Sequence, residues 1–170
     1  MVPNIDSSRV DLLERLKEVT QDAIKDLILP VRIQREGEDQ SYRSADVYLM
    51  RLPDSKSATK KAPYIIHQLI TGRDMQEEGQ RVTSTAQVRS IFCVYSDDEQ
   101  EGGLMLLGLM ERLRIKLLKQ VVIGERYQLD LKQAAEALIY PDDTAPYFAG
   151  EMVTTWKIPS IEREVRQWLQ

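Results

Sequence analysis

The stretch from Ser96 to Gln120 constrains the fold most, because its apolar residues recur at helical spacing on more than one side. One stripe consists of Leu106, Leu109, Met110, Leu113 and Leu117. A second stripe consists of Leu104, Leu107, Ile115 and Leu118, interrupted by Glu111. The stretch therefore predicts a core helix that begins between Asp97 and Gly103 and has more apolar surface than one contact can cover.

The ends of this stretch also favour a helix. Its acidic residues gather at the start, where the helix dipole favours negative charge, and its basic residues lie near the end. Ser96 and Glu99 have the spacing of a capping box. The second stripe allows two interpretations: an N-terminal helix covers it within the subunit, or it remains free to contact another subunit.

Composition limits the class of protein. The 170 residues suit a single domain, with 42% hydrophobic and 29% charged residues, as in ordinary globular proteins. A net charge of −4 argues against non-specific nucleic-acid binding. A single cysteine, Cys93, excludes an internal disulfide. The chain shows neither a membrane-spanning apolar run nor a signal-peptide pattern, so we expect it in the cytoplasm or in a particle assembled there.

The rest of the chain alternates between helical and strand patterns. Ser8 to Ile28 has the pattern of an amphipathic helix that ends before Pro30, and Ile161 to Leu169 is consistent with a short helix. Strands are predicted at Val31–Arg35, Ala45–Leu52, Pro63–Thr71, Arg81–Tyr95, Val121–Leu131, Leu138–Tyr140 and Tyr147–Ile158.

The segments between these elements complete the predicted fold. Gly37–Arg43 is predicted to be a turn or loop, Pro53–Ala62 a flexible loop, and Gly72–Gln80 the charged connection of an antiparallel hairpin. Pro63–Thr71 is apolar on both faces, as in a strand covered on both sides. We therefore predict an α+β domain, with a mainly antiparallel sheet and two helices packed on one of its faces.

Acidic pairs are the first candidate sites. Asp97 and Asp98, with Glu99 and Glu101, could bind a divalent cation, but the favourable charge at a helix start explains them more simply. Asp142 and Asp143 could act as an acid and base pair, yet between a proline and a threonine they are typical turn residues. We therefore predict no metal site and no catalytic carboxylates.

Other reactive or basic residues also have structural explanations. His67 is flanked by Ile66 and Leu69 in a predicted strand, which favours a partly buried structural role, and Cys93 suits a core position. Gly102 and Gly103 lack the spacing of a phosphate-binding motif, so close packing or a helix that begins late explains them better. The lysines of the flexible loop are a possible partner-contact set: Lys56, Lys60 and Lys61.

Three phrases of the sequence carry a family resemblance. They are PYIIHQLITGRD, IFCVYSDDEQEGGLMLLGLMERLRIKLLKQ and YPDDTAPYFAGEMVTTWKIP. In these phrases and in the order of its elements, the chain from about Pro63 to Pro159 resembles the tail terminator, or tail completion, proteins of long-tailed bacteriophages and prophages. None of the phrases is a catalytic motif.

The resemblance implies a structural protein of the virion without cofactor or catalytic residues. Such a protein forms a hexameric ring that caps the tail tube, stops its polymerisation and meets the head connector. The implied partners are further copies of the chain, the tail tube protein and a connector or neck protein. No membrane and no sequence-specific nucleic acid is expected.

Two alternatives remain open at this stage. A neck or head–tail connector protein of the same particle would share the size and fold type. A small ligand-binding or enzymatic domain would instead require a pocket of converging polar groups, with His67 and the acidic residues as its candidates.

Overall fold

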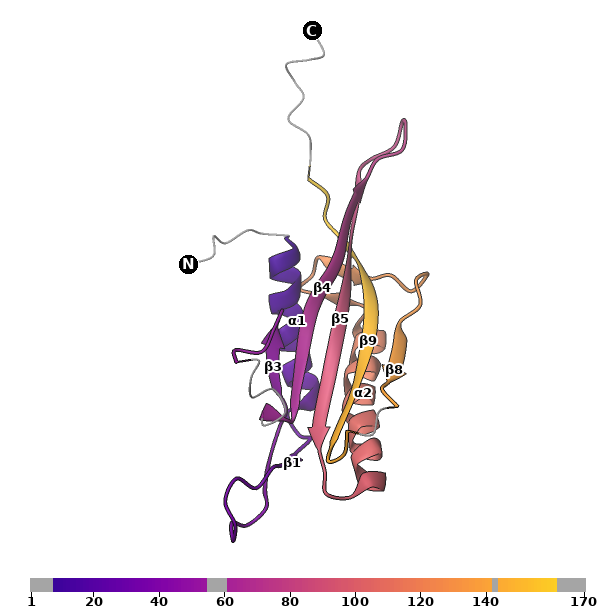
Figure 1. Ribbon diagram of the computed structural model, residues 1–170. Helices are drawn as coiled ribbons and strands as arrows, with labels where there is room; N and C mark the ends of the chain where they lie inside the picture. The colour runs from indigo at the N-terminus through magenta and orange to yellow at the C-terminus, as the bar shows by residue number, and fades with distance from the viewer. Residues whose placement is uncertain (1–7, 55–60, 142–143, 162–170) are drawn as a thin grey trace.

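The structure, a computed structural model, describes residues 8–54, 61–141 and 144–161 and has two helices beside a curled sheet (Figure 1). The elements are α1 (Arg9–Ile24), β1 (Leu29–Val31), β2 (Ser41–Arg43), β3 (Asp46–Leu49), β4 (Tyr64–Met75), β5 (Thr83–Tyr95), α2 (Glu99–Gln120), β6 (Val122–Ile123), β7 (Tyr127–Leu129), β8 (Glu136–Ile139) and β9 (Tyr147–Ile158).

Within the described residues the strands form one seven-stranded sheet and one two-stranded sheet. The large sheet has the order β3-β4-β5-β9-β7-β6, and β8 pairs with β9 beside β7. Only the β3–β4 pair is parallel, and β1 pairs with β2 separately. This arrangement confirms the predicted α+β class with a mainly antiparallel sheet.

Strands β4 and β5 form the predicted antiparallel hairpin, which projects beyond the helices as an arm (Figure 1). The sequence prediction was wrong about the end of β4, because pairing continues through the charged residues to Met75 opposite Thr83. The side chains of these charged residues can point to solvent while their backbone groups keep the hydrogen bonds of the sheet. The carboxylate of Asp74 in β4 accepts a hydrogen bond from the hydroxyl of Ser84 at 2.6 Å and forms an ion pair with the guanidinium of Arg9 at 3.2 Å.

The N-terminal helix is shorter than predicted. Ser8 is its N-cap and accepts a hydrogen bond from the backbone N–H of Asp11 at 3.1 Å, but the helix ends at Ile24 instead of Ile28. The chain turns there and buries Leu29 in β1. The strand predicted at Val31–Arg35 and the turn predicted at Gly37–Arg43 were therefore misplaced, since β2 lies within the latter.

Helix α2 begins at Glu99, inside the predicted interval, but the predicted capping box is wrong. Asp98 is the N-cap, and its carboxylate accepts from the backbone N–H groups of Gln100 and Glu101 at 2.9 and 3.1 Å. Ser96 instead binds the backbone of Asp98. Close packing is confirmed at Gly102, where a Cβ would meet the ring of Phe148. A late helix start is wrong as an explanation of the glycines, because both lie within the helix.

The region after α2 forms more strands than predicted. Val121–Leu131 is two strands, β6 and β7, because Gly124 and Glu125 adopt positive φ of 57° and 61° and turn the chain. Strand β8 begins earlier than the predicted Leu138–Tyr140, whereas β9 has the predicted bounds. The helix predicted at Ile161–Leu169 lies outside the described residues except for Ile161.

The main core joins both helices to the sheet. Helix α1 contacts β3 and β4, and α2 contacts β5 and β9. Buried side chains of all these elements form one apolar cluster that includes Leu16 of α1, Leu113 of α2 and Trp156 of β9. Strand β4 is buried on both faces only from Tyr64 to His67, so the prediction of two-sided cover holds for that part alone. Among the described residues, no helix is long and apolar enough to cross a membrane.

Candidate contact surfaces

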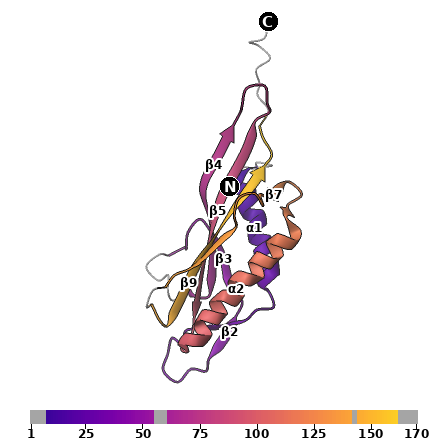
Figure 2. The ribbon, with the colours of Figure 1, turned by 90° about the vertical axis from the view of Figure 1, so that its right-hand side faces the viewer.

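The two stripes of α2 differ completely in burial. All five residues of the first stripe are buried. The second stripe is exposed: Leu104 by 69%, Leu107 by 42%, Ile115 by 44% and Leu118 by 39%. Figure 2 views the molecule from the side on which α2 lies in front of the sheet. The interpretation in which the N-terminal helix covers the second stripe is therefore wrong, and α2 presents an apolar surface to solvent.

Helix α1 contacts a flank of α2 and not its outer side. The ammonium of Lys116 lies 3.0 Å from the carboxylate of Asp22 in α1, and this contact, with that of Lys25, lowers the pKa of Asp22. Near the start of α2, Leu27 and Ile28 border a shallow apolar groove together with Leu104 and Met105. The second stripe thus continues into a groove at one end and remains open along its length.

Charged residues flank the second stripe. On a helical projection, Arg112 and Lys119 lie on one side of it and Arg114 lies on the other. All three are exposed. Arg114 pairs with Glu111 at 3.0 Å, whereas Arg112 and Lys119 form no ion pair with another described residue. The outer side of α2 is therefore apolar along its middle and basic along its flanks over its C-terminal half.

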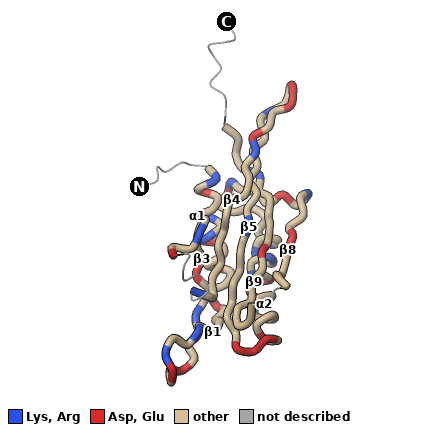
Figure 3. The backbone as a smooth tube through the Cα atoms, viewed as in Figure 1, with Lys and Arg blue, Asp and Glu red and all other residues tan. Residues whose placement is uncertain are grey.

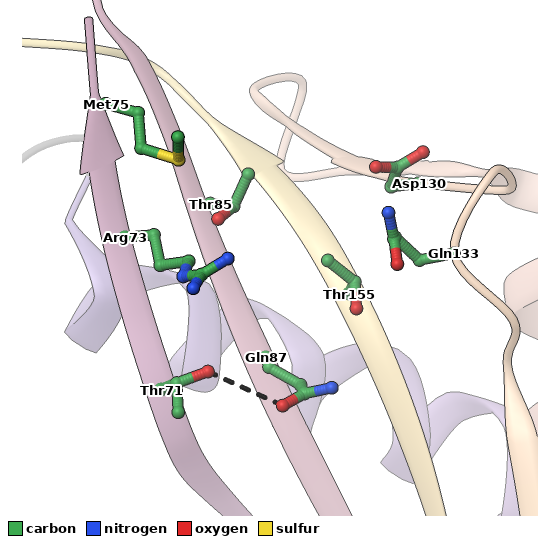
Figure 4. Close-up of a pocket in the computed structure, with 8 residues that line it drawn as sticks. All are labelled: Thr71, Arg73, Met75, Thr85, Gln87, Asp130, Gln133 and Thr155. Carbon is green, nitrogen blue, oxygen red and sulfur yellow. Dashed lines mark hydrogen bonds between the residues drawn. The ribbon is translucent and has the colours of Figure 1, made fainter.

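The arm and the open side of the sheet form a second surface. Strands β4, β5 and β9 carry alternating side chains on the side away from the main core, and a hollow of about 430 Å³ lies there (Figure 4). Its lining residues are Thr71, Arg73, Met75, Thr85, Gln87, Asp130, Gln133 and Thr155.

The polar groups of this hollow carry opposite charges on opposite walls. Figure 4 shows Arg73 on β4 across from Asp130, which follows β7. Thr71 donates a hydrogen bond to the side-chain oxygen of Gln87 at 3.4 Å. The sequence analysis missed this set because its members come from three strands and a turn. Their only sequence signal is the alternation of polar residues along β5 and β9.

His67 is fully buried, more deeply than predicted, and joins α1 to the sheet. Its Nε2 lies 2.8 Å from the hydroxyl of Thr20, which itself donates to the carbonyl of Leu16. Nε2 must therefore carry the proton, and Nδ1 accepts from the hydroxyl of Ser90 at 2.7 Å. Burial lowers the pKa of His67 to about 3. This neutral, fully bonded imidazole has a structural role and no access to a substrate.

Cys93 is buried in a second, smaller apolar cluster. The cluster consists of Leu52, Ala62, Tyr64, Ile66, Cys93 and Tyr95. Burial raises the pKa of the Cys93 thiol to about 11, so the reactive thiolate is scarce at neutral pH. The predicted core position of Cys93 is confirmed.

The acidic candidates are placed only in part. The residues Asp97, Asp98, Glu99 and Glu101 lie at the start of α2, in the acidic turn below the α2 label in Figure 3. Asp98 caps the helix, and Asp97 accepts from the hydroxyl of Tyr95 at 2.6 Å. In the described part of the chain, no three His, Cys, Asp or Glu residues could hold a metal ion together. Asp142 and Asp143 lie outside the described residues.

The lysines of the predicted contact loop are also placed only in part. Lys56 and Lys60 lie outside the described residues, as does the loop interior. Lys61 is half-buried, and its backbone carbonyl accepts from the guanidinium of Arg43 at 2.8 Å. The loop therefore returns to the body of the domain at Lys61, and its role in partner contact stays a prediction.

Neither the known protein families nor the curated proteins provide a match to this chain. The surfaces described above are therefore the features that bear on its function. Of these, the outer side of α2 departs most from what a monomeric protein requires, because soluble monomers rarely leave several large apolar side chains uncovered on one side of a helix.

Proposed function

We propose that this chain is the subunit of a ring that caps the tail tube of a long-tailed bacteriophage or prophage. In this role it ends tail polymerisation and meets the head connector. The observation that carries the proposal is the second stripe of α2, which leaves Leu104, Leu107, Ile115 and Leu118 exposed. The family resemblance supplies the identity of the particle and the hexameric number of subunits.

We also infer that α1 and α2 share one face of the sheet. The support is that both helices contribute buried residues to the same cluster, with Val47 and Ile65 beside α1 and Phe92 and Met152 beside α2. This arrangement makes the outer side of α2 an outer surface of the subunit. It leaves the hollow and the arm on a different side.

A ring requires two different patches on each subunit, because a heterologous interface joins unlike surfaces and closes when the rotation is suitable. The second stripe serves as one patch. The neighbouring copy must contact this stripe with a different surface, one that is apolar at its centre.

Weakening the second stripe tests the self-association. The variant Leu107→Gln is expected to lower the association constant about tenfold or more, since burying a leucine is worth about 1.5–3 kcal/mol. Sedimentation velocity over a wide concentration range measures the effect. The matched control is Val10→Gln, because Val10 is similarly exposed, by 45%, but lies on α1.

The ring itself is tested by electron microscopy of mixtures with the tail tube protein. Added density at tube ends, lost in Leu107→Gln and kept in Val10→Gln, is expected. Strictly monomeric sedimentation and bare tube ends would reject the ring and the terminator together. A two-fold dimer that buries the second stripe would reject the ring only. Binding to the connector without binding to tubes would favour the neck-protein alternative.

The hollow supports a second candidate function, the binding of a small polar ligand. Arg73 and Asp130 place opposite charges across it, with Gln87 between them, a pattern suited to a zwitterion such as an amino acid or dipeptide. A titration with free amino acids and dipeptides, read as a rise in melting temperature, tests it. A rise that disappears in Arg73→Ala would favour binding, and no rise with any compound would reject it.

A further inference from the structure

We propose that residues 161–169 of one copy bind along the second stripe of α2 in the next copy. This inference rests on the proposed ring and names its second patch. It accounts for two features together: an apolar helix surface without cover, and a segment after β9 with apolar residues at helical spacing.

The segment has the pattern of a helix with one narrow apolar side. Ile161, Val165, Trp168 and Leu169 follow the spacing i, i+4, i+7 and i+8, which places them within one stripe of a helix. Ile161, the one member among the described residues, is exposed by 86%. A large aromatic residue among aliphatic ones is typical of the anchors with which a helix binds a groove.

The charges of the two surfaces are complementary. On the helical projection of the segment, Glu162 and Glu164 lie on the two sides of the apolar stripe, while Arg163 and Arg166 lie on the opposite side. The stripe on α2 has cations on both sides, namely Arg112 and Lys119 on one and Arg114 on the other. Either orientation of the segment therefore brings a carboxylate near a guanidinium or an ammonium.

The path of the chain favours a neighbouring copy over the same copy. After β9 ends at Ile158, the hydroxyl of Ser160 donates to the carbonyl of Val82 at 2.7 Å, next to the start of β5 in the arm. Up to Ile161 the chain is thus held beside the arm, beyond the ends of both helices (Figure 1). The second stripe extends from Leu104 to Leu118, about 21 Å at 1.5 Å per residue. Nine residues in a helix would span about 14 Å, so the segment would cover about two thirds of the stripe.

The small size of this contact suits a ring that forms only where it is needed. A single short helix buries few anchors, so one contact alone is weak, and several contacts closing a ring reinforce one another. Free subunits would then associate only weakly until a tube end gathers them.

Disulfide trapping tests the contact with two full-length variants that carry different tags. One carries Glu111→Cys, in the middle of the second stripe, and the other carries Val165→Cys, in the middle of the apolar side of the segment. Mixed under mild oxidation, they are expected to form a mixed disulfide dimer about tenfold faster than random encounter allows. The matched control is Arg163→Cys, on the opposite side of the segment. The native Cys93 is buried and does not interfere.

Each alternative has its own result. Dimers of the Glu111→Cys chain alone would indicate a two-fold contact and overturn the proposal. An internal disulfide in the double variant, with no mixed dimer, would place the segment on its own α2 and also overturn it. Equal trapping by Val165→Cys and Arg163→Cys would show that the segment does not bind through its apolar side, and would overturn the proposal. Caps on tube ends without any mixed disulfide would reject this contact and leave the proposed function standing.

Discussion

Lowering the pH from 7.5 to 5 is expected to reduce the free energy of unfolding by about 2 kcal/mol through His67 alone. Burial lowers the pKa of His67 to about 3 in the folded protein, against about 6.5 in the unfolded chain. Between these values the unfolded state binds a proton that the folded state does not. The stabilising effect is therefore complete above pH 6.5 and is lost as the pH falls toward 3.

Urea denaturation at several pH values between 7.5 and 5 measures this loss. The control is His67→Gln, whose amide can donate toward Thr20 and accept from Ser90 without titrating. The variant should unfold more easily than the wild-type protein at pH 7.5, and the difference should shrink toward pH 5 because the variant lacks the histidine-dependent slope. Parallel slopes in the wild-type protein and the variant would show that His67 is not held neutral by burial.

Replacing Trp156 with alanine is expected to cost about 3–5 kcal/mol, the usual range for removing a large buried aromatic side chain. Trp156 is fully buried in β9 and pairs across the sheet with Ala86 of β5 and Leu129 of β7. The small side chain of Ala86 leaves room for the indole. The indole N–H of Trp156 donates to the hydroxyl of Thr154 at 2.9 Å, so the one polar atom of this side chain has a partner.

Lys157→Ala provides the matched control for Trp156→Ala. Lys157 is the next residue of the same strand, is exposed, and keeps the same backbone pairing with Thr85 and Gln128. Its replacement should change the free energy of unfolding by no more than about 0.5 kcal/mol. A loss below 1 kcal/mol for Trp156→Ala, on the same order as surface changes, would contradict the central place of this residue.

The sequence by itself determined the elements whose patterns are long and regular. The start of α2 and the bounds of β9 agree with prediction, because their apolar residues repeat at the period of a helix or of a strand over many residues. The existence of two apolar stripes on α2 was also readable from the sequence. The sequence did not show which of the two stripes the sheet would bury, because both have the helical period.

Only the tertiary structure decided the features that depend on distant residues. The partners of His67 are Thr20 and Ser90, which lie 47 and 23 positions away and have no motif in common. Strand β4 extends through charged residues to Met75 because β5 pairs with its backbone, and backbone pairing leaves no mark in side-chain periodicity. The placement of α1 on the flank of α2, and not on its outer side, likewise depends on how both helices pack against the sheet. That packing leaves Leu104, Leu107, Ile115 and Leu118 exposed, because a helix buries only the sides that face its neighbouring elements.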